Sequence, residues 1–150
     1  MNKLKKIIIG LLLSISIVGF AQNDTYSSNI VGKWKLSDFK VRDATVNGES
    51  KSVSEIRELE NLMKKNKTFV IGDIIEFASN GVRYYNGQFH GIYQVNGNKL
   101  TWSEEGHSAE GSIEGNQLKL EVIFNFEDEE SGITKIIINL SFTKEAGKRE

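Results

Sequence analysis

Residues 80–103 read NGVRYYNGQFHGIYQVNGNKLTWS, and three Asn-Gly pairs divide this stretch into short segments of alternating polar and apolar residues. An Asn-Gly pair between alternating segments is a strong signal for a β-hairpin, because both central residues of a type I′ turn need positive φ. The stretch therefore predicts strands over 82–85, 88–95 and 99–103, joined by tight antiparallel turns.

The same alternation extends along most of the chain and predicts five further strands, over 33–41, 73–78, 107–113, 118–126 and 133–143. One apolar face per strand suits a barrel and a sandwich equally. Consecutive tight connections indicate an antiparallel meander, and closure into a barrel removes exposed strand edges. We therefore expect an all-β fold: an eight-stranded up-and-down antiparallel barrel, whose interior has room for side chains or one small ligand.

One helix is expected between the first two strands, at about residues 52–67. Ser52 and Glu55 have the spacing of a capping box at its start. Charged residues occupy one face, and apolar residues recur at helical spacing on the other: Val53, Ile56, Leu59, Leu62 and Met63. We expect this apolar face to pack against the barrel or cap it, and the alternative is that it binds a partner.

The first 21 residues have the features of a signal peptide. Three lysines precede an apolar core over 7–18, which is too short to span a membrane as a helix, and Gly19 and Ala21 are small residues before a cleavage point. The chain has no cysteine, which excludes disulfides, thiolate metal sites and a lipid-anchored cysteine after cleavage. We expect an exported soluble protein, periplasmic or extracellular, that is neither a lipoprotein nor inserted in a membrane.

Removal of residues 1–21 leaves 129 residues, the size of one domain. We expect a flexible leader over 22–29, the barrel over 30–144 and a polar tail over 145–150. The mature chain has sixteen basic and twenty acidic residues, a net charge of −4. This balance argues against nucleic acid as a partner, because basic residues must replace the counterions of phosphates. It also disfavours docking on anionic lipid.

Three motifs together resemble the bacterial secreted lipocalin-like domains, which are calycin-type barrels: Gly32-Lys33-Trp34, Ile75-Glu76-Phe77 and Gly91-Ile92-Tyr93-Gln94-Val95. The resemblance covers about residues 31–143. It implies that Gly32 and Trp34 open the first strand and that Trp34 packs across one barrel end, with Lys144 as the candidate for a basic residue above it. It also implies a small apolar ligand. The helix lies elsewhere in animal-type lipocalins, after the last strand.

The alternation predicts which side chains point into the barrel. Trp102 would lie beside the small residues Ala109 and Gly111, an arrangement that leaves unfilled volume unless large neighbours fill it. Ligand cavities are mostly apolar with a few placed polar groups. The candidate ligand-binding residues are Tyr93, Trp102, His107, Leu120 and Phe124.

Catalytic and metal sites receive little support from the sequence. His90 and His107 fall on opposite strand faces by the alternation, so we do not expect them to share a metal. The acidic run over 127–130 lacks the spaced oxygen ligands and glycine of a calcium loop. Only Asp73 and His107 are expected to be inward-facing groups suited to acid–base chemistry. We therefore expect no enzyme, no metal and no cofactor.

Three functions are considered, and a hydrolase or isomerase comes last because it would need convergent polar groups inside the cavity. The other two are close. The first is an exported carrier of a small apolar molecule, held in the barrel cavity. The second is a module that binds an envelope, extracellular or host protein, with a filled barrel and an exposed apolar patch around Ile92, Ile123 and Ile137.

Overall fold

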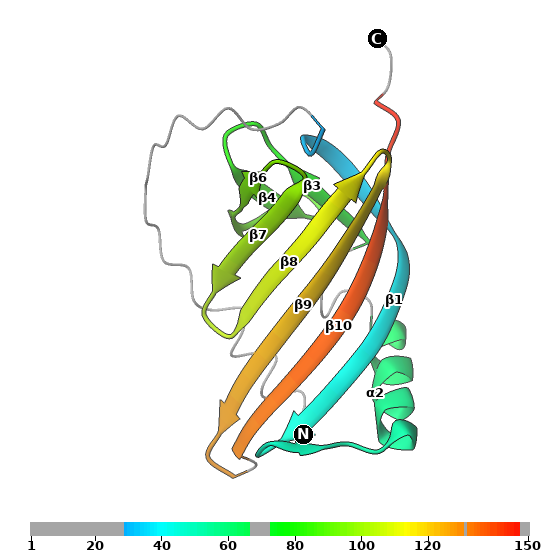
Figure 1. Cartoon of the computed structure of the whole chain (residues 1–150), viewed down its shortest axis with the longest axis vertical. Coiled ribbons are helices and arrows are strands. Elements are labelled where there is room, and N and C mark those ends of the chain that lie inside the picture. Colours follow the sequence, from blue (N-terminus) through cyan, green and yellow to red (C-terminus); the bar gives the residue numbers. More distant parts are fainter. Residues whose placement is uncertain (1–28, 67–72, 131, 148–150) are drawn as a thin grey trace.

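The computed structural model describes residues 29–66, 73–130 and 132–147 (Figure 1). The expected signal peptide, nearly all of the expected leader and the end of the tail lie outside these residues. In the described ranges the chain forms one helix and ten strands: β1 Gly32–Val46, β2 Glu49–Ser50, α2 Val53–Lys65, β3 Ile74–Phe77, β4 Val82–Tyr85, β5 Gln88–Ile92, β6 Gln94–Asn96, β7 Lys99–Glu104, β8 His107–Glu114, β9 Gln117–Asp128 and β10 Gly132–Lys144.

All ten strands belong to one antiparallel sheet, with the order β5-β4-β3-β1-β10-β9-β8-β7-β6 and with β2 paired to β1. The two end strands of this order, β5 and β6, are separated in the chain by Tyr93 alone. The first half of this segment pairs with β4 and the second half with β7, so the chain itself links the two ends of the sheet. The result is a near-closed antiparallel barrel.

The all-β antiparallel class and the position of the helix are confirmed, but the strand count of eight was wrong. The expected strand over 88–95 is interrupted at Tyr93, which gives β5 and β6. In addition, Glu49–Ser50 folds back on the end of β1 as β2. Strand β5 also contains a bulge before Gly91: the β4–β5 register shifts between Arg83 and Tyr84, and Gly91 takes a φ of 128°.

The Asn-Gly pairs form turns, but not all of the same kind. At the Asn86-Gly87 turn both residues have positive φ, 47° and 79°, as a type I′ turn requires. At Asn80-Gly81 and Asn96-Gly97 only the glycine does, and Asn96 is the last residue of β6. The sequence pair therefore predicted where the chain reverses more reliably than it predicted the turn geometry.

Near the start of β1, Trp34 is fully buried. The indole Nε1 donates a hydrogen bond to the Ile30 carbonyl, 2.8 Å away. Lys144 pairs with Trp34 in the β1–β10 register, and its ammonium lies 5.3 Å from the indole centroid while donating to the Asn29 carbonyl. Gly32 stands at the start of β1 with a φ of 126° and Lys144 close to it. These contacts join the start of β1 to the end of β10.

The other end of the barrel wall is built differently. Residues 32–35 of β1 pair with β3, but beyond Lys35 the strand leaves β3, and α2 lies beside the lower part of β1 (Figure 1). The Val41 amide donates to the Glu60 carboxylate of α2 at 3.0 Å, and Met63 is buried in the core. The apolar face of the helix therefore packs on the barrel, although Val53 and Leu62 stay exposed.

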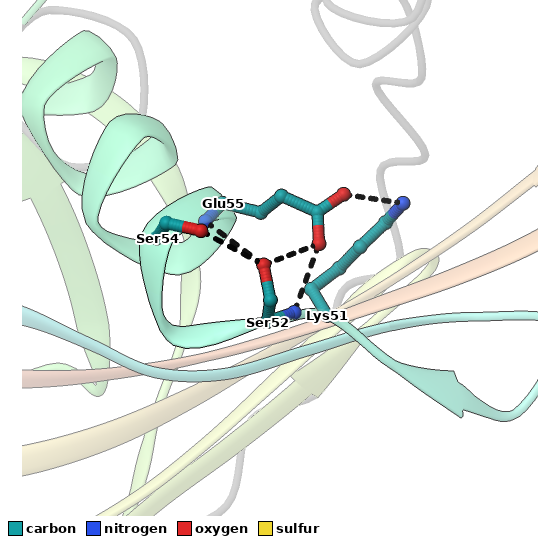
Figure 2. Close-up of polar contacts among 4 residues, drawn as sticks. All are labelled: Lys51, Ser52, Ser54 and Glu55. Atoms are coloured by element: carbon teal, nitrogen blue, oxygen red, sulfur yellow. Dashed lines mark hydrogen bonds and ion pairs between the residues drawn. The ribbon is translucent and has the colours of Figure 1, made fainter.

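The start of α2 is stabilised by the expected capping box (Figure 2). The Ser52 hydroxyl accepts from the Glu55 amide, and the Glu55 carboxylate accepts from the Ser52 amide at 2.9 Å. The Ser52 hydroxyl also donates to the Glu55 carboxylate at 2.7 Å. This hydrogen bond, followed by those from the Ser52 amide and from Lys51, lowers the pKa of Glu55 to about 2. In the described part of the chain no helix is long and apolar enough to span a membrane.

We expect Ser52→Ala to weaken α2 by about 1 kcal/mol, because it removes the side-chain oxygen that accepts from an otherwise unpaired amide. Hydrogen exchange of the α2 amides measures this local free energy directly. Ser103→Ala, on the exposed face of β7, is the control. Equal exchange in the two variants would contradict a role for the cap.

Candidate functional site

Arg83 is the one charged side chain that is fully buried in the described ranges of the chain. It lies on β4, and in the β4–β5 register it stands opposite Gly91. Because Gly91 has no side chain, the guanidinium reaches past β5 to Glu104 on β7, with which it forms an ion pair. A Cβ at Gly91 would overlap the Glu104 carboxylate and lie 3.2 Å from Arg83 Nη2. The glycine therefore makes the ion pair sterically feasible.

The Arg83 guanidinium has several further partners inside the barrel. It donates to the backbone carbonyls of Ile92 and His90 on β5, the latter at 3.1 Å, and to the Tyr85 hydroxyl at 3.3 Å. It also lies over the Trp102 ring, 4.5 Å from its centroid, in a cation–π contact. One side chain thus connects β4, β5 and β7.

Glu104 also faces a histidine. Glu104 and His107 are paired across β7 and β8, and His107 Nε2 lies 3.5 Å from Glu104 Oε2. The His107 ring stacks on Phe124 of β9, with centroids 5.7 Å apart. Burial lowers the pKa of His107 below its usual 6.5, although the Glu104 carboxylate and the Glu105 backbone oppose this effect. The imidazole is therefore mostly neutral at pH 7.

His90 and Tyr85 complete the group. Their rings lie 4.0 Å apart, and burial followed by the charge of Arg83 lowers the pKa of His90. Burial raises the pKa of the Tyr85 hydroxyl, which therefore stays protonated. We call the following residues the Arg83 cluster: Arg83, Tyr85, His90, Trp102, Glu104 and His107.

Two buried polar atoms in the described structure lack a hydrogen-bond partner, Trp102 Nε1 and His107 Nδ1. Both belong to the Arg83 cluster, and we call them the open polar atoms. Trp102 is 5 % exposed and the His107 side chain 9 % exposed. An unsatisfied buried donor or acceptor costs about 1–3 kcal/mol, so these atoms mark a place where a partner would be stabilising.

The candidate residues from the sequence are only partly brought together. Trp102 and His107 belong to the cluster, and Phe124 stacks on His107. The Tyr93 hydroxyl is already engaged, because it donates to the Ala78 carbonyl at 2.6 Å. Leu120 is buried on β9 opposite Gly111 of β8.

One open alternative about the interior is resolved, and two expectations were wrong. A Cβ on Gly111 would overlap Leu120, so a large neighbour fills the space beside this glycine. His90 does not lie on the opposite face from His107, because the bulge before Gly91 turns His90 toward Tyr85. Asp73 is exposed.

Sequence reasoning also missed Arg83, Tyr85 and Glu104 as inward residues. A signal was present: Arg83 and Tyr85 share a face by alternation, as do Trp102 and Glu104. Charged residues are rarely fully buried, and this general rule outweighed the alternation. In the described part of the chain no group of three or more histidine or acidic residues is placed to hold a metal.

The expected outer apolar patch does not form around its three isoleucines. Ile137 is 7 % exposed and Ile123 is half-buried, whereas Ile92 is 57 % exposed on β5. The neighbouring exposed apolar residue is Phe89, whose ring meets Tyr84 edge-on at 6.4 Å. The exposed apolar surface on this side is therefore smaller than expected.

The fold and the cluster together define a small near-closed antiparallel barrel with a polar centre in an apolar interior. No family model matches the chain, and no curated protein matches it. Among solved structures, the chain is similar to the zebrafish ileal bile acid-binding protein complexed with cholic acid. The identity is 16 %, the TM-score is 0.43, and the match covers 79 % of this chain and all of that one.

We expect Gly91→Ala to destabilise the barrel by about 2 kcal/mol or more, because the new Cβ displaces Glu104 and strains a backbone with a φ of 128°. Urea unfolding measures the loss. Gly97→Ala is the control, since Gly97 also has positive φ but open space around its Cβ position. Equal losses in both variants would contradict a role for the overlap with Glu104.

We expect the melting temperature to fall when the pH drops from 7.5 to 5.5. The pKa of His107 and that of His90 lie below the ordinary value of 6.5 in the folded state, so the unfolded chain takes up protons first as the pH falls. Glu55 and Glu60 titrate below this window, because their pKa values are lowered from 4.5. Calorimetry of the wild type and of His107→Gln tests this, and an unchanged slope in the variant would contradict it.

Proposed function

We propose that this protein is an exported, lipocalin-like carrier that binds a small, mostly apolar molecule inside the barrel, next to the Arg83 cluster. The observation that carries the proposal is the pair of open polar atoms, which lie in the Arg83 cluster and are surrounded by the apolar core of the barrel. Ligand sites in barrels typically combine an apolar lining with a few polar groups that fix orientation. The export part of the proposal rests on the features of residues 1–21.

The lining around the open polar atoms suits an apolar ligand. The ring centroids of Phe77 and Trp102 lie 6.3 Å apart. On the side of His107, the rings of Phe124 and Phe126 stack with centroids 6.0 Å apart. Aromatic side chains present large apolar faces and pack against rings or alkyl chains. In this structure both open polar atoms are covered, so a ligand enters by displacing side chains that now pack over them.

The α2 side of the barrel is the favoured place of entry. Beyond Lys35 the wall beside β1 consists of α2, which is joined to it by side-chain packing and by the Val41–Glu60 hydrogen bond. Moving such a helix breaks fewer backbone hydrogen bonds than separating paired strands does, and loosely held elements open at lower free energy. The opposite end is tied by Trp34 and Lys144.

A protein-binding module remains the second candidate. Phe89 and Ile92 are 59 % and 57 % exposed on β5, and exposed apolar residues of this size favour contact with a partner. This candidate predicts a barrel that stays filled and an interaction that is lost when these two side chains become polar.

The test uses N-phenyl-1-naphthylamine, an uncharged apolar fluorescent probe. We expect saturable binding and a shift of the Trp102 indole N–H resonance, while the Trp34 resonance stays in place because its indole already donates to Ile30. Phe89→Ser is the control for binding at the surface, and we expect it to leave probe binding unchanged. Absence of saturable binding, or binding lost in Phe89→Ser, would overturn the carrier and favour the interaction module.

A further inference from the structure

We propose that the ligand's polar group is an uncharged hydroxyl rather than a carboxylate, because the open polar atoms require one acceptor and one donor beside a cluster of zero net charge. This inference rests on the proposed function and names its ligand class. It follows from the tautomer of His107, from the indole of Trp102 and from the pairing of Arg83.

The carboxylate of Glu104 favours one tautomer of His107. It can only accept a hydrogen bond and lies 3.5 Å from His107 Nε2, so it stabilises the neutral imidazole that carries its proton on Nε2. The other ring nitrogen, Nδ1, then has a free lone pair and accepts. A partner of His107 Nδ1 must therefore donate a hydrogen bond.

Trp102 has the opposite requirement. The indole Nε1–H is a donor only, so its partner must accept. A hydroxyl offers a donor and an acceptor on the same oxygen, whereas an ionised carboxylate offers acceptors alone. A carboxylate would leave His107 Nδ1 facing a second acceptor.

The strand register places the residues that carry the two open polar atoms at neighbouring positions on the inner face of the sheet. Trp102 pairs with Ala109 across β7 and β8, and Glu104 pairs with His107. Trp102 and His107 are therefore diagonal neighbours on the inner face, and such residues have Cβ atoms about 7–8 Å apart or less. Two large aromatic side chains at this spacing can meet one small polar group.

The charges of the cluster also disfavour a carboxylate. Arg83 is neutralised by Glu104, and its donors already reach Tyr85, His90 and Ile92. With both histidines neutral, the cluster holds one positive and one negative charge. A carboxylate would therefore be buried without a free cation to pair with, which costs several kcal/mol in comparable settings.

The test compares 1-decanol with decanoate at pH 7.5 by titration calorimetry on the mature chain. We expect 1-decanol to bind at least about ten-fold more tightly, which corresponds to about 1.4 kcal/mol. Equal or tighter binding of decanoate would overturn the hydroxyl preference while leaving the carrier intact. Failure of both compounds and of the uncharged fluorescent probe would overturn the carrier as well.

Glu104→Gln tests the cause of the preference. The amide NH2 of glutamine can donate to His107 Nε2, which moves the imidazole proton to Nδ1, and Arg83 loses its counter-charge. We expect the preference for 1-decanol to shrink or to invert. Glu110→Gln, on the exposed face of β8, makes the same charge change away from the cluster and should have no effect.

Two further measurements keep the test independent of how well Glu104→Gln folds. Nitrogen-15 NMR of wild-type His107 should show a protonated Nε2 and an unprotonated Nδ1, and the reverse tautomer would overturn the inference. Trp102→Phe keeps an aromatic ring but removes the donor, so 1-decanol should bind several-fold more weakly. Unchanged affinity for 1-decanol in this variant would also overturn it.

Discussion

Where the two ends of this sheet meet, strand β5 lacks a partner on one edge, and the Arg83 side chain pairs with its carbonyl groups there. The segment over 88–96 pairs through β5 with β4 and through β6 with β7, so β5 has no strand partner on its other edge within the described sheet. Unpaired carbonyls in the interior are costly, and the guanidinium satisfies those of His90 and Ile92. The planar guanidinium has five N–H donors in a fixed geometry, so arginine can pair with several carbonyl groups at once. The single ammonium group of lysine cannot reach them in the same way.

The rest of the site follows from that one buried cation. A buried arginine needs a counter-charge, which Glu104 supplies, and the crossing from β4 to β7 requires a residue without a side chain at Gly91. The Glu104 carboxylate also lies 3.5 Å from His107 Nε2, so it links Arg83 to the histidine. The two open polar atoms therefore belong to residues of the same polar network that links the two ends of the sheet.

The sequence predicted the parts of this molecule that depend on local rules. The hairpins, the antiparallel class and the capping box of Ser52 and Glu55 all depend on turn chemistry and short-range spacing. The interior polar cluster was not predicted, because it depends on a one-residue bulge before Gly91 that reverses the side-chain alternation of β5. The break at Tyr93 likewise arises from barrel closure, which brings β4 and β7 to different halves of one segment.

The open polar atoms distinguish two explanations for the interior of the barrel: a core that only packs, and a site that binds a ligand. A phenylalanine at position 102 and an apolar residue at position 107 would fill much of the same space without any polar atom to satisfy. Stability alone therefore favours the apolar pair, by about 1–3 kcal/mol for each polar atom left unpaired, out of a total that is typically 5–15 kcal/mol. A cost of that size is offset when a bound molecule pairs these atoms, because ligand binding stabilises the folded state. The polar groups at Trp102 and His107 are thus more easily explained by a ligand than by packing.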